Sequence, residues 1–305
     1  MKKARTITRF PSPSRSSNRS GLSGVGLNRN LTHERRHLFI RRLVLGAALI
    51  GICVGSGVVS GQTARGAVTS GASLTEPATF PTATGHLPTA VEPVRVPAGK
   101  TVDFHNEGVA GTTSGRSEFQ QPVVVVGDGA TVKNLIIEPP AADGVHCLGT
   151  CTLDHVWWPA VGEDAATLQD GSPVTAKMTV VGGGARNAYD KVFQLDGAGT
   201  ASIRDFSAED IGTLVVSCGR CIHQYQRHVE VRNSVVKNGH YHVAGVNRNY
   251  GDSAEFAGIT IIGKHIHVCQ ESIGHTDRDA EYLPYTDPDV ACRYDPATIL
   301  YRSTK

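Results

Sequence analysis

Two short segments decide the fold: Thr131-Val132-Lys133-Asn134-Leu135-Ile136-Ile137 and Cys151-Thr152-Leu153-Asp154-His155-Val156-Trp157. They share one pattern of apolar and polar residues, and residues 201–207 and 229–235 repeat it. The matching positions Val132, Leu153, Ile203 and Val231 are separated by 21, 50 and 28 residues, and the gap of 50 has room for a further copy near 178–181. A repeat of this length is typical of a solenoid, in which each coil stacks on the next.

The pattern of residues along the chain indicates strands from Val91 onward. From Val91 onward, short β-branched segments alternate with Gly, Asn and Asp turns, and no stretch shows a long helical stripe. A helical repeat needs longer amphipathic stretches, and a propeller blade needs about 40 residues. We therefore predict an all-β fold, a parallel β-helix whose coils bury their apolar side chains against one another.

The N-terminal region is predicted to be an export leader. Residues 1 to about 42 are basic, and the apolar run 43–59 follows them. We divide the chain into a leader at 1–66, a linker rich in Thr, Pro and Ala at 67–90, and the β-helix domain at 91–305. The apolar run is shorter than the about 20 residues of a spanning helix. We expect a secreted, extracellular protein without a stable membrane anchor, a permanent anchor being the alternative.

Removing the leader reverses the charge of the protein. Residues 1–67 hold twelve Lys and Arg but one acid, Glu34, so 18 basic and 27 acidic residues remain, a net charge of −9. The remainder has no basic run, which argues against a nucleic-acid partner. Six cysteines follow Cys53, an even number typical of disulfides in an exported chain. Of the fifteen possible pairings, sequence proximity favours Cys147–Cys151, Cys218–Cys221 and Cys269–Cys292.

A second track of residues carries acids. Asp143, Asp164, Asp190 and Asp210 each precede a short apolar segment, at spacings of 21, 26 and 20. We expect them to align as a ladder at one corner of the β-helix. Carboxylates stacked about 4.8 Å apart repel unless a cation neutralises them. Calcium, which takes six to eight oxygens, suits Asp143, Glu163 and Asp164. The alternative is that these are ordinary turn-forming residues.

Several motifs carry a family resemblance across roughly residues 90 to 260. They are Gly127-Asp128-Gly129-Ala130, Asp143-Gly144-Val145-His146-Cys147, Gly162-Glu163-Asp164-Ala165 and Asp190-Lys191-Val192-Phe193-Gln194. In this order they resemble the compact secreted pectate lyases of polysaccharide lyase family three. The resemblance implies a right-handed parallel β-helix that cleaves de-esterified polygalacturonate by calcium-assisted β-elimination. By position it implies Asp143, Glu163 and Asp164 as calcium ligands and Lys191 as a catalytic and substrate-binding residue of the cleft. We expect the protein to be a monomer.

One motif departs from the family pattern. Members carry Gly-Lys-Leu-x-Arg, and this chain reads Gly212-Thr213-Leu214-Val215-Val216. Thr213 therefore stands at the lysine position and Val216 at the arginine position. If that arginine is the base, another residue must serve, and Arg220 or Arg204 are the candidates. A weak lyase, a relocated base and a non-catalytic binder of acidic polysaccharide all stay open. A hydrolase of the polygalacturonase type ranks last, because its motifs are missing from the sequence.

Overall fold

The structure is a computed structural model that describes residues 75–113, 115 and 121–304. The chain divides into two compact units, 1–64 and 65–305, and the described residues belong to the second. The predicted leader, with Cys53, lies outside the described residues. Within the described ranges, no helix has the length and apolar character that crossing a membrane requires.

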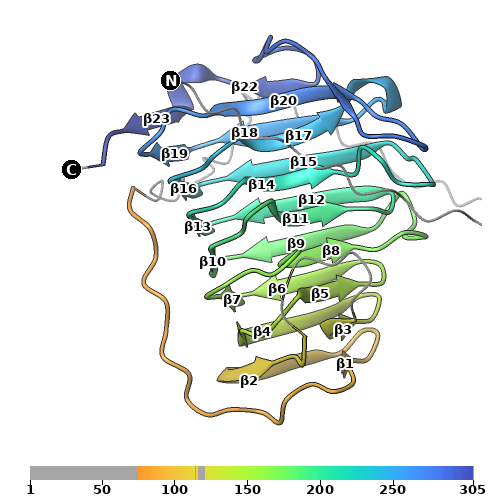
Figure 1. Ribbon diagram of the computed structural model, residues 1–305, viewed down its shortest axis with the longest axis vertical. Coiled ribbons are helices and arrows are strands. Elements are labelled where there is room, and N and C mark those ends of the chain that lie inside the picture. The colour runs from red at the N-terminus through yellow and green to blue at the C-terminus, as the bar shows by residue number, and fades with distance from the viewer. Residues whose placement is uncertain (1–74, 114, 116–120, 305) are drawn as a thin grey trace, which may run out of the picture. The chain divides into compact units, whose positions relative to one another are not determined.

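The first face of the fold is a nine-stranded sheet, to which almost every coil contributes one strand (Figure 1). Neighbouring strands pair in parallel, apart from the antiparallel pair β20–β21 at the C-terminal end. In spatial order the strands are β1 (Val94–Val96), β3 (Pro122–Val126), β5 (Asp143–Cys147), β8 (Ala166–Leu168), β11 (Lys191–Leu195), β14 (Thr213–Ser217), β17 (His242–Asn247), β20 (His267–Ile273) and β21 (Glu281–Tyr282).

A fourteen-stranded sheet supplies the other two faces. The long strands β2 (Thr101–Ala110) and β4 (Ala130–Glu138) run across both of them. The second face continues with β6 (Cys151–Asp154), β9 (Lys177–Val181), β12 (Gly199–Arg204), β15 (Arg227–Arg232), β18 (Ser253–Ala257) and β22 (Cys292–Tyr294). The third continues with β7 (Trp157–Trp158), β10 (Gly184–Arg186), β13 (Ser207–Glu209), β16 (Val235–Lys237), β19 (Ile259–Ile262) and β23 (Ile299–Arg302). Two 3₁₀ turns are described, η1 (Arg248–Tyr250) and η2 (Pro296–Thr298).

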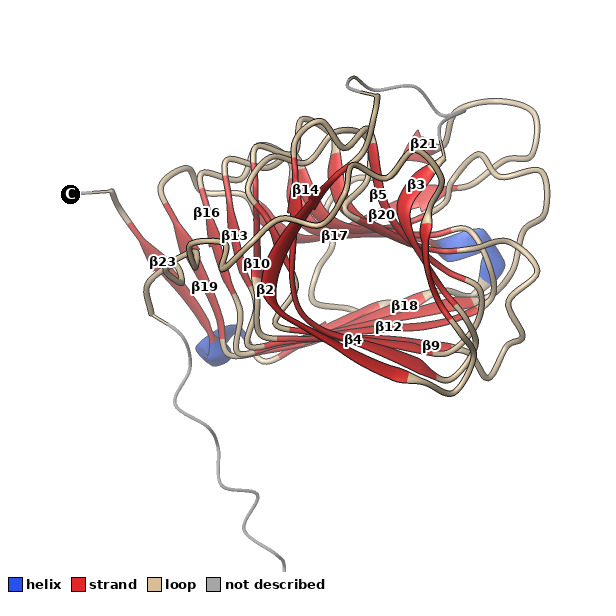
Figure 2. Cartoon of the chain, turned by 90° about the horizontal axis from the view of Figure 1, so that it is seen from below, coloured by secondary structure: helices blue, strands red, loops and turns tan. Residues whose placement is uncertain are grey.

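Seen near the coil axis, the three faces enclose one interior (Figure 2). The parallel β-helix is thus confirmed, and so is the repeat on which it was predicted. Val132 pairs with Leu153, Leu153 with Val180, and Val180 with Ile203. Ile203 pairs in turn with Val231. Val180 belongs to the copy expected in the gap of 50 residues, so the spacing of the apolar positions correctly gave the stacking of the coils.

Sharp corners depend on residues that tolerate positive φ. Between the second and third faces, Asn134, His155, Asp205 and Asn233 have φ of 50°, 55°, 57° and 48°. Between the third face and the nine-stranded sheet, Asn187, Asp210 and Asn238 have φ of 58°, 55° and 53°. Asn and Asp adopt this left-handed conformation more readily than most residues. The Asn and Asp residues of the repeat therefore bend each coil at the same two places.

Apolar side chains and disulfides close the interior. Trp158, Phe193 and Phe206 are buried and form a cluster of ring contacts, with centroids 5.1 Å apart for the two phenylalanines. All three predicted disulfides are present, Cys147–Cys151, Cys218–Cys221 and Cys269–Cys292, with Cα–Cα distances of 5.9, 5.7 and 5.9 Å. The first two close turns of single coils, and the third joins β20 to β22.

Residues 75–90, predicted as part of a linker, run along the third face (orange in Figure 1). Glu76 pairs with Arg302 of β23 at 2.9 Å, and the Ala78 amide donates to Ser207 Oγ of β13 at 2.9 Å. Phe80 packs edge-on against Trp157 and beneath the Arg186 guanidinium. His86 bridges to Gly108 of β2. The segment thus crosses successive coils from the C-terminal toward the N-terminal end.

Asp196, a half-buried acid, gives the protein a pH-dependent stability. Burial raises the pKa of Asp196 to about 6, although the Arg227 guanidinium opposes the shift. The folded state therefore holds a proton that the unfolded state has released, and unfolding becomes easier as pH rises from about 4 to 6. The expected loss is about 3 kcal/mol of unfolding free energy.

We expect Asp196→Asn, which is neutral at every pH, to flatten this part of the stability profile. Urea unfolding of both proteins between pH 4 and 7 measures it. The slope rather than the absolute stability is diagnostic, because the variant also removes a charge partner of Arg227. Parallel profiles for the two proteins would contradict the assignment.

Candidate functional site

The site is built from the first residues of successive strands in the nine-stranded sheet. The strand register places Asp143, Asp164, Lys191, Thr213 and His242 at equivalent positions of five coils. We call these five residues the corner row. Three positions further along each coil is a second row, which consists of His146, Thr167, Gln194, Val216 and Gly245. We call it the outer row.

Contacts within three of the five coils join the two rows. His146 Nε2 lies 2.6 Å from Asp143 Oδ2, and the Thr167 hydroxyl donates to Asp164 Oδ2 at 3.4 Å. The side chain of His242 lies against Gly245, where an added Cβ would meet His242 Nε2 at 3.1 Å. The corner-row side chains therefore reach the outer surface of the sheet rather than its apolar interior.

Three carboxylates gather around one ammonium group. Lys191 Nζ lies 2.7 Å from Glu163 Oε1, 3.3 Å from Asp164 Oδ1 and 3.3 Å from Asp190 Oδ2. Asp143 belongs to the neighbouring coil, and its charge acts on Asp164. The side chains of Asp143, Glu163 and Asp164 are 13%, 11% and 4% exposed, so the acids lie in a recess and not on an open loop.

The backbone around Glu163 is tightly packed. Gly162 has no room for a Cβ, which would lie 2.3 Å from the Ala141 carbonyl oxygen of the preceding coil. The Glu163 amide donates to the Ala142 carbonyl at 2.5 Å. Glycine at 162 therefore lets the coil approach its neighbour at the point where Glu163 and Asp164 begin. The short Gly-Glu-Asp turn is what allows adjacent residues to direct both carboxylates at Lys191.

The electrostatics of the recess leave negative charge uncompensated. Burial raises the pKa of Asp164, the Lys191 ammonium opposes that rise, and the charges of Glu163 and Asp143 add to it. Burial lowers the pKa of Lys191, but Asp164, Glu163 and Asp190 outweigh it, so the net shift is upward. Lys191 is thus a fixed cation, and its single positive charge is shared by three neighbouring carboxylates.

Two oxygen atoms indicate that the recess suits a further cation. Asp143 Oδ1 is buried and accepts no hydrogen bond from the described residues, and Asp164 Oδ1, also buried, has only the Lys191 ammonium as a partner, at 3.3 Å. Buried polar atoms without a partner are uncommon in folded proteins and call for an explanation such as a bound ion. Carboxylate oxygens are the donors that calcium and other hard cations prefer. The donor set therefore has the chemistry of a calcium site, with Asp143 Oδ1 unpaired and the Glu163 and Asp164 carboxylates paired with Lys191.

The predicted ladder of four aspartates is partly wrong. Asp143 and Asp164 share the corner row, but the residue that pairs with Thr213 on the next coil is Lys191 and not Asp190. Asp210 lies three residues before Thr213 and has a positive φ of 55°, so it is a corner residue of the turn. The spacings of 26 and 20 residues did not reveal that Asp190 and Asp210 lie outside the corner row, because the turns before β11 and β14 have different lengths.

The structure also places the positions where the chain departs from the family pattern. Thr213 is buried in the corner row beside Lys191, and Val216 stands in the outer row between Gln194 and Gly245. Arg220 lies beyond the other end of β14, in the Cys218–Cys221 turn, where its guanidinium pairs with Asp279 at 3.0 Å. Ser217, the last residue of β14, is already about 13 Å from Thr213 along an extended strand.

Arg204 does not adjoin the recess either. It belongs to β12 on the second face, and it pairs with Asp205 at 3.2 Å. The corner row contains a further residue that the sequence did not single out for this site, His242. Burial lowers its pKa to about 4, and the charge of His267 adds to that effect. His242 is therefore a neutral imidazole at neutral pH, and its equivalence to Lys191 could be found only by counting turn lengths.

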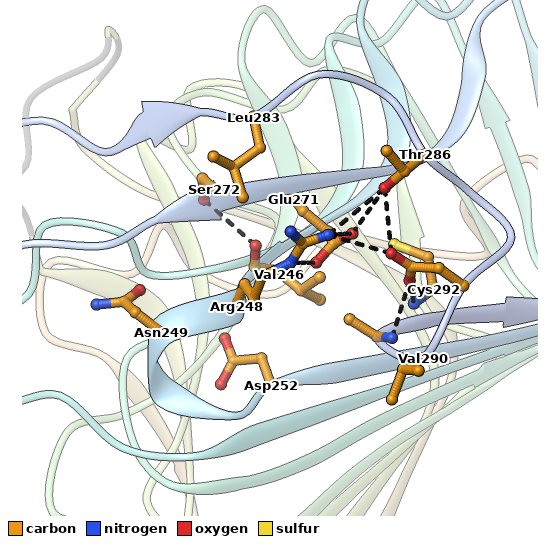
Figure 3. Close-up of polar contacts among 12 residues, drawn as sticks. Val246, Arg248, Asn249, Asp252, Glu271, Ser272, Leu283, Thr286, Val290 and Cys292 are labelled. Atoms are coloured by element: carbon orange, nitrogen blue, oxygen red, sulfur yellow. Dashed lines mark hydrogen bonds and ion pairs between the residues drawn. The ribbon is translucent and has the colours of Figure 1, made fainter.

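Two other groups of possible metal ligands are satisfied by the protein. Cys218 and Cys221, near Asp196, are joined in a disulfide and offer no thiolate. Around Glu271 and Asp289, the Arg248 guanidinium occupies the centre (Figure 3). It lies 2.6 Å from Glu271 Oε1 and 3.2 Å from Asp289 Oδ2, and the Thr286 hydroxyl donates to both acids. This cluster fastens the C-terminal loop to η1 and β20.

Known proteins share this architecture. A family model described as pectate lyase matches residues 77–278. Pectate lyase H of Emericella nidulans is 37% identical over 228 residues, which cover 70% of this chain and 86% of that relative. Probable pectate lyase D of the same organism is 44% identical over 176 residues, 57% of this chain and 66% of the relative.

Solved structures agree with these relatives. The catalytic domain of pectate lyase PelI from Erwinia chrysanthemi is 29% identical, with a TM-score of 0.58, and the match covers 71% of this chain and 98% of that domain. PelI in complex with tetragalacturonic acid is 30% identical, with a TM-score of 0.57 and 68% of each chain covered. From the family match and these relatives it follows that the chain belongs to the pectate lyase family.

Proposed function

We propose that this protein is a secreted pectate lyase that cleaves de-esterified polygalacturonate by calcium-assisted β-elimination. The observation that carries the proposal is the recess of Asp143, Glu163 and Asp164, in which Asp143 Oδ1 is buried without a hydrogen-bond donor and Asp164 Oδ1 has only the Lys191 ammonium as a partner. The acidic charge of the chain after its leader adds support, since a bridging cation removes the repulsion between an acidic protein and an acidic polymer.

In the proposed reaction, the proton on the carbon next to the uronate carboxylate, C5, is removed. The electron pair of the C5–H bond forms the double bond between C4 and C5, and the bond from C4 to the glycosidic oxygen breaks. The proton goes to the base, and the leaving oxygen takes a proton from water to become a hydroxyl group. Negative charge develops on the uronate carboxylate as the proton leaves. Calcium would supply Lewis-acid stabilisation of that charge, and Asp143, Glu163 and Asp164 would hold it.

Lys191 has the second role, as the residue that contacts the uronate carboxylate. Its ammonium is charged at every working pH, because the surrounding carboxylates raise its pKa. A fixed cation placed where negative charge develops lowers the barrier without having to reorganise. Binding of substrate would draw Nζ from its position among the three acids toward the uronate, which would leave the oxygens of Glu163 and Asp164 for the metal.

The proton-abstracting base is the point at which this chain differs from the family pattern. Arg220, the candidate from the sequence, would have to reach back from the far end of β14, and its pairing with Asp279 is exposed to solvent. A general base typically contributes about 10²–10⁴ in rate. We therefore propose a slower lyase than a relative with an arginine in the outer row, acting as a monomer on pectate.

A second candidate function, a binder of acidic polysaccharide that does not cleave it, is favoured by one observation. Val216 presents an aliphatic side chain in the outer row, at the position where the family pattern has arginine. The carboxylates and Lys191 alone suffice for a calcium-bridged contact with uronate. Such a binder would use the same recess and differ only in lacking the proton-abstracting group.

One assay separates the candidates. We expect the protein, incubated with polygalacturonate and calcium at alkaline pH, to generate ultraviolet absorbance from unsaturated uronate ends. Excess chelator should abolish it, and restored calcium should recover it. New reducing ends without absorbance would indicate hydrolysis. Calcium-dependent retention of the polymer without new ends would leave the binder as the function.

A further inference from the structure

A hollow of ≈ 480 Å³ lies beside the recess, on the turns that enter the nine-stranded sheet. Its lining includes Tyr189, Asp210, His240, Tyr241 and Lys264. These residues come from the turns before β11, β14, β17 and β20, so four successive coils build it. Ligand sites in proteins span about 300–1,000 Å³, which makes the hollow large enough for one or two sugar units.

The lining has the chemistry of a site for acidic sugar. Tyr189 and Tyr241 are 59% and 51% exposed, so their rings are accessible from solvent. An aromatic ring offers an apolar face to the C–H face of a sugar and a hydroxyl to its polar rim. Lys264 is exposed and supplies a cation for a uronate carboxylate, with Nζ 3.4 Å from the His240 carbonyl oxygen. The Asp210 carboxylate, which also accepts from Asn238 at 2.9 Å, can receive a sugar hydroxyl.

The hollow is continuous with the recess along the chain. Tyr189 directly precedes Asp190, whose carboxylate lies 3.3 Å from Lys191 Nζ. From the coil of Lys191 to that of Lys264 there are three steps between strands, about 14 Å at the usual strand separation. An oligosaccharide with one uronate at Lys191 thus reaches the hollow with a later unit of the same chain.

We infer that this hollow is a binding subsite for a uronate unit remote from the scissile bond, with Tyr241 contacting the ring and Lys264 the carboxylate. The inference rests on the proposed function, because the recess must hold another unit of the same polymer. Such a subsite would make the protein favour long, de-esterified chains through residues outside the carboxylate recess.

Calorimetric titration with hexagalacturonate tests the inference, carried out in chelator so that calcium-dependent cleavage cannot proceed. We expect Tyr241→Ala and Lys264→Gln each to weaken binding about three- to tenfold. Lys100→Gln is the matched control, since Lys100 is an exposed lysine before β2 at the opposite end of the coils. It should bind as the unsubstituted protein does.

The methyl-esterified hexamer separates ring from carboxylate recognition. Tyr241→Ala should weaken its binding as well, whereas Lys264→Gln should leave it unchanged within twofold. Unchanged affinity for hexagalacturonate in both variants, or no binding by the unsubstituted protein, would overturn the inference. The absorbance assay is independent: a protein that binds at the hollow but forms no unsaturated ends would refute the lyase and leave the subsite standing.

Discussion

We expect Asp164→Asn to weaken calcium binding by about a hundredfold or more and to remove calcium-dependent cleavage of pectate. Asp164 is the most deeply buried acid of the recess, and its Oδ1 has only the Lys191 ammonium, 3.3 Å away, as a partner. Even partners outside the ligand set typically change metal affinity by about 10- to 100-fold. Loss of a ligand charge should cost at least as much. Calcium titration by calorimetry measures the change.

Asp190→Asn is the matched control for this substitution. Its carboxylate also lies 3.3 Å from Lys191 Nζ, but its side chain is largely exposed and it stands outside the corner row. Calcium affinity should therefore change by less than about threefold, as for other exposed charge pairs. In chelator, Asp164→Asn should unfold at a Tm no lower than the unsubstituted protein, because burial already disfavours the charged carboxylate. Equal calcium affinities for both variants would contradict the ligand assignment.

The second large effect is a gain. We expect Val216→Arg to raise the rate of pectate cleavage by about 10²–10⁴, the contribution of a positioned general base. The family pattern has arginine at this position, and the outer row offers it space, since Val216 is flanked by Gly245 on the next coil. The side chain would extend over the sheet beside Lys191, where the uronate is proposed to bind.

Val216→Gln controls for length and polarity without the guanidinium. It should leave the rate within about threefold, and the two variants should share the same calcium affinity because neither touches the recess. Initial rates of absorbance increase at saturating calcium measure both. A Val216→Arg protein no faster than Val216→Gln would show that the base lies elsewhere or that the site only binds.

Much of this account could be derived from the sequence because the β-helix repeats. Stacking coils impose one register, so Val132, Leu153, Ile203 and Val231 could be aligned by pattern alone. The disulfides followed because each pair lies close in sequence or closes neighbouring coils. The acids at 163 and 164 could be placed at a bend, since a regular strand would have directed them to opposite faces.

The corner row could not be derived in the same way. Turns between the third face and the nine-stranded sheet differ in length, so counting aspartates put Asp190 and Asp210 where Lys191 and Thr213 stand. Because turn lengths differ, the sequence also did not place His242 in the corner row. The strand pairing of β14 with β17 places it there, two coils beyond Lys191. No sequence pattern indicated that Tyr189, Tyr241 and Lys264 lie close together, because each residue occupies a turn of a different coil.

The most direct test of the central claim is an anomalous-scattering map from crystals of this protein soaked in calcium. The account predicts a peak contacted by the carboxylates of Asp143, Glu163 and Asp164, with Lys191 Nζ displaced from its place among them. A crystal that binds calcium only elsewhere, with Lys191 still between Glu163 and Asp164, would contradict it.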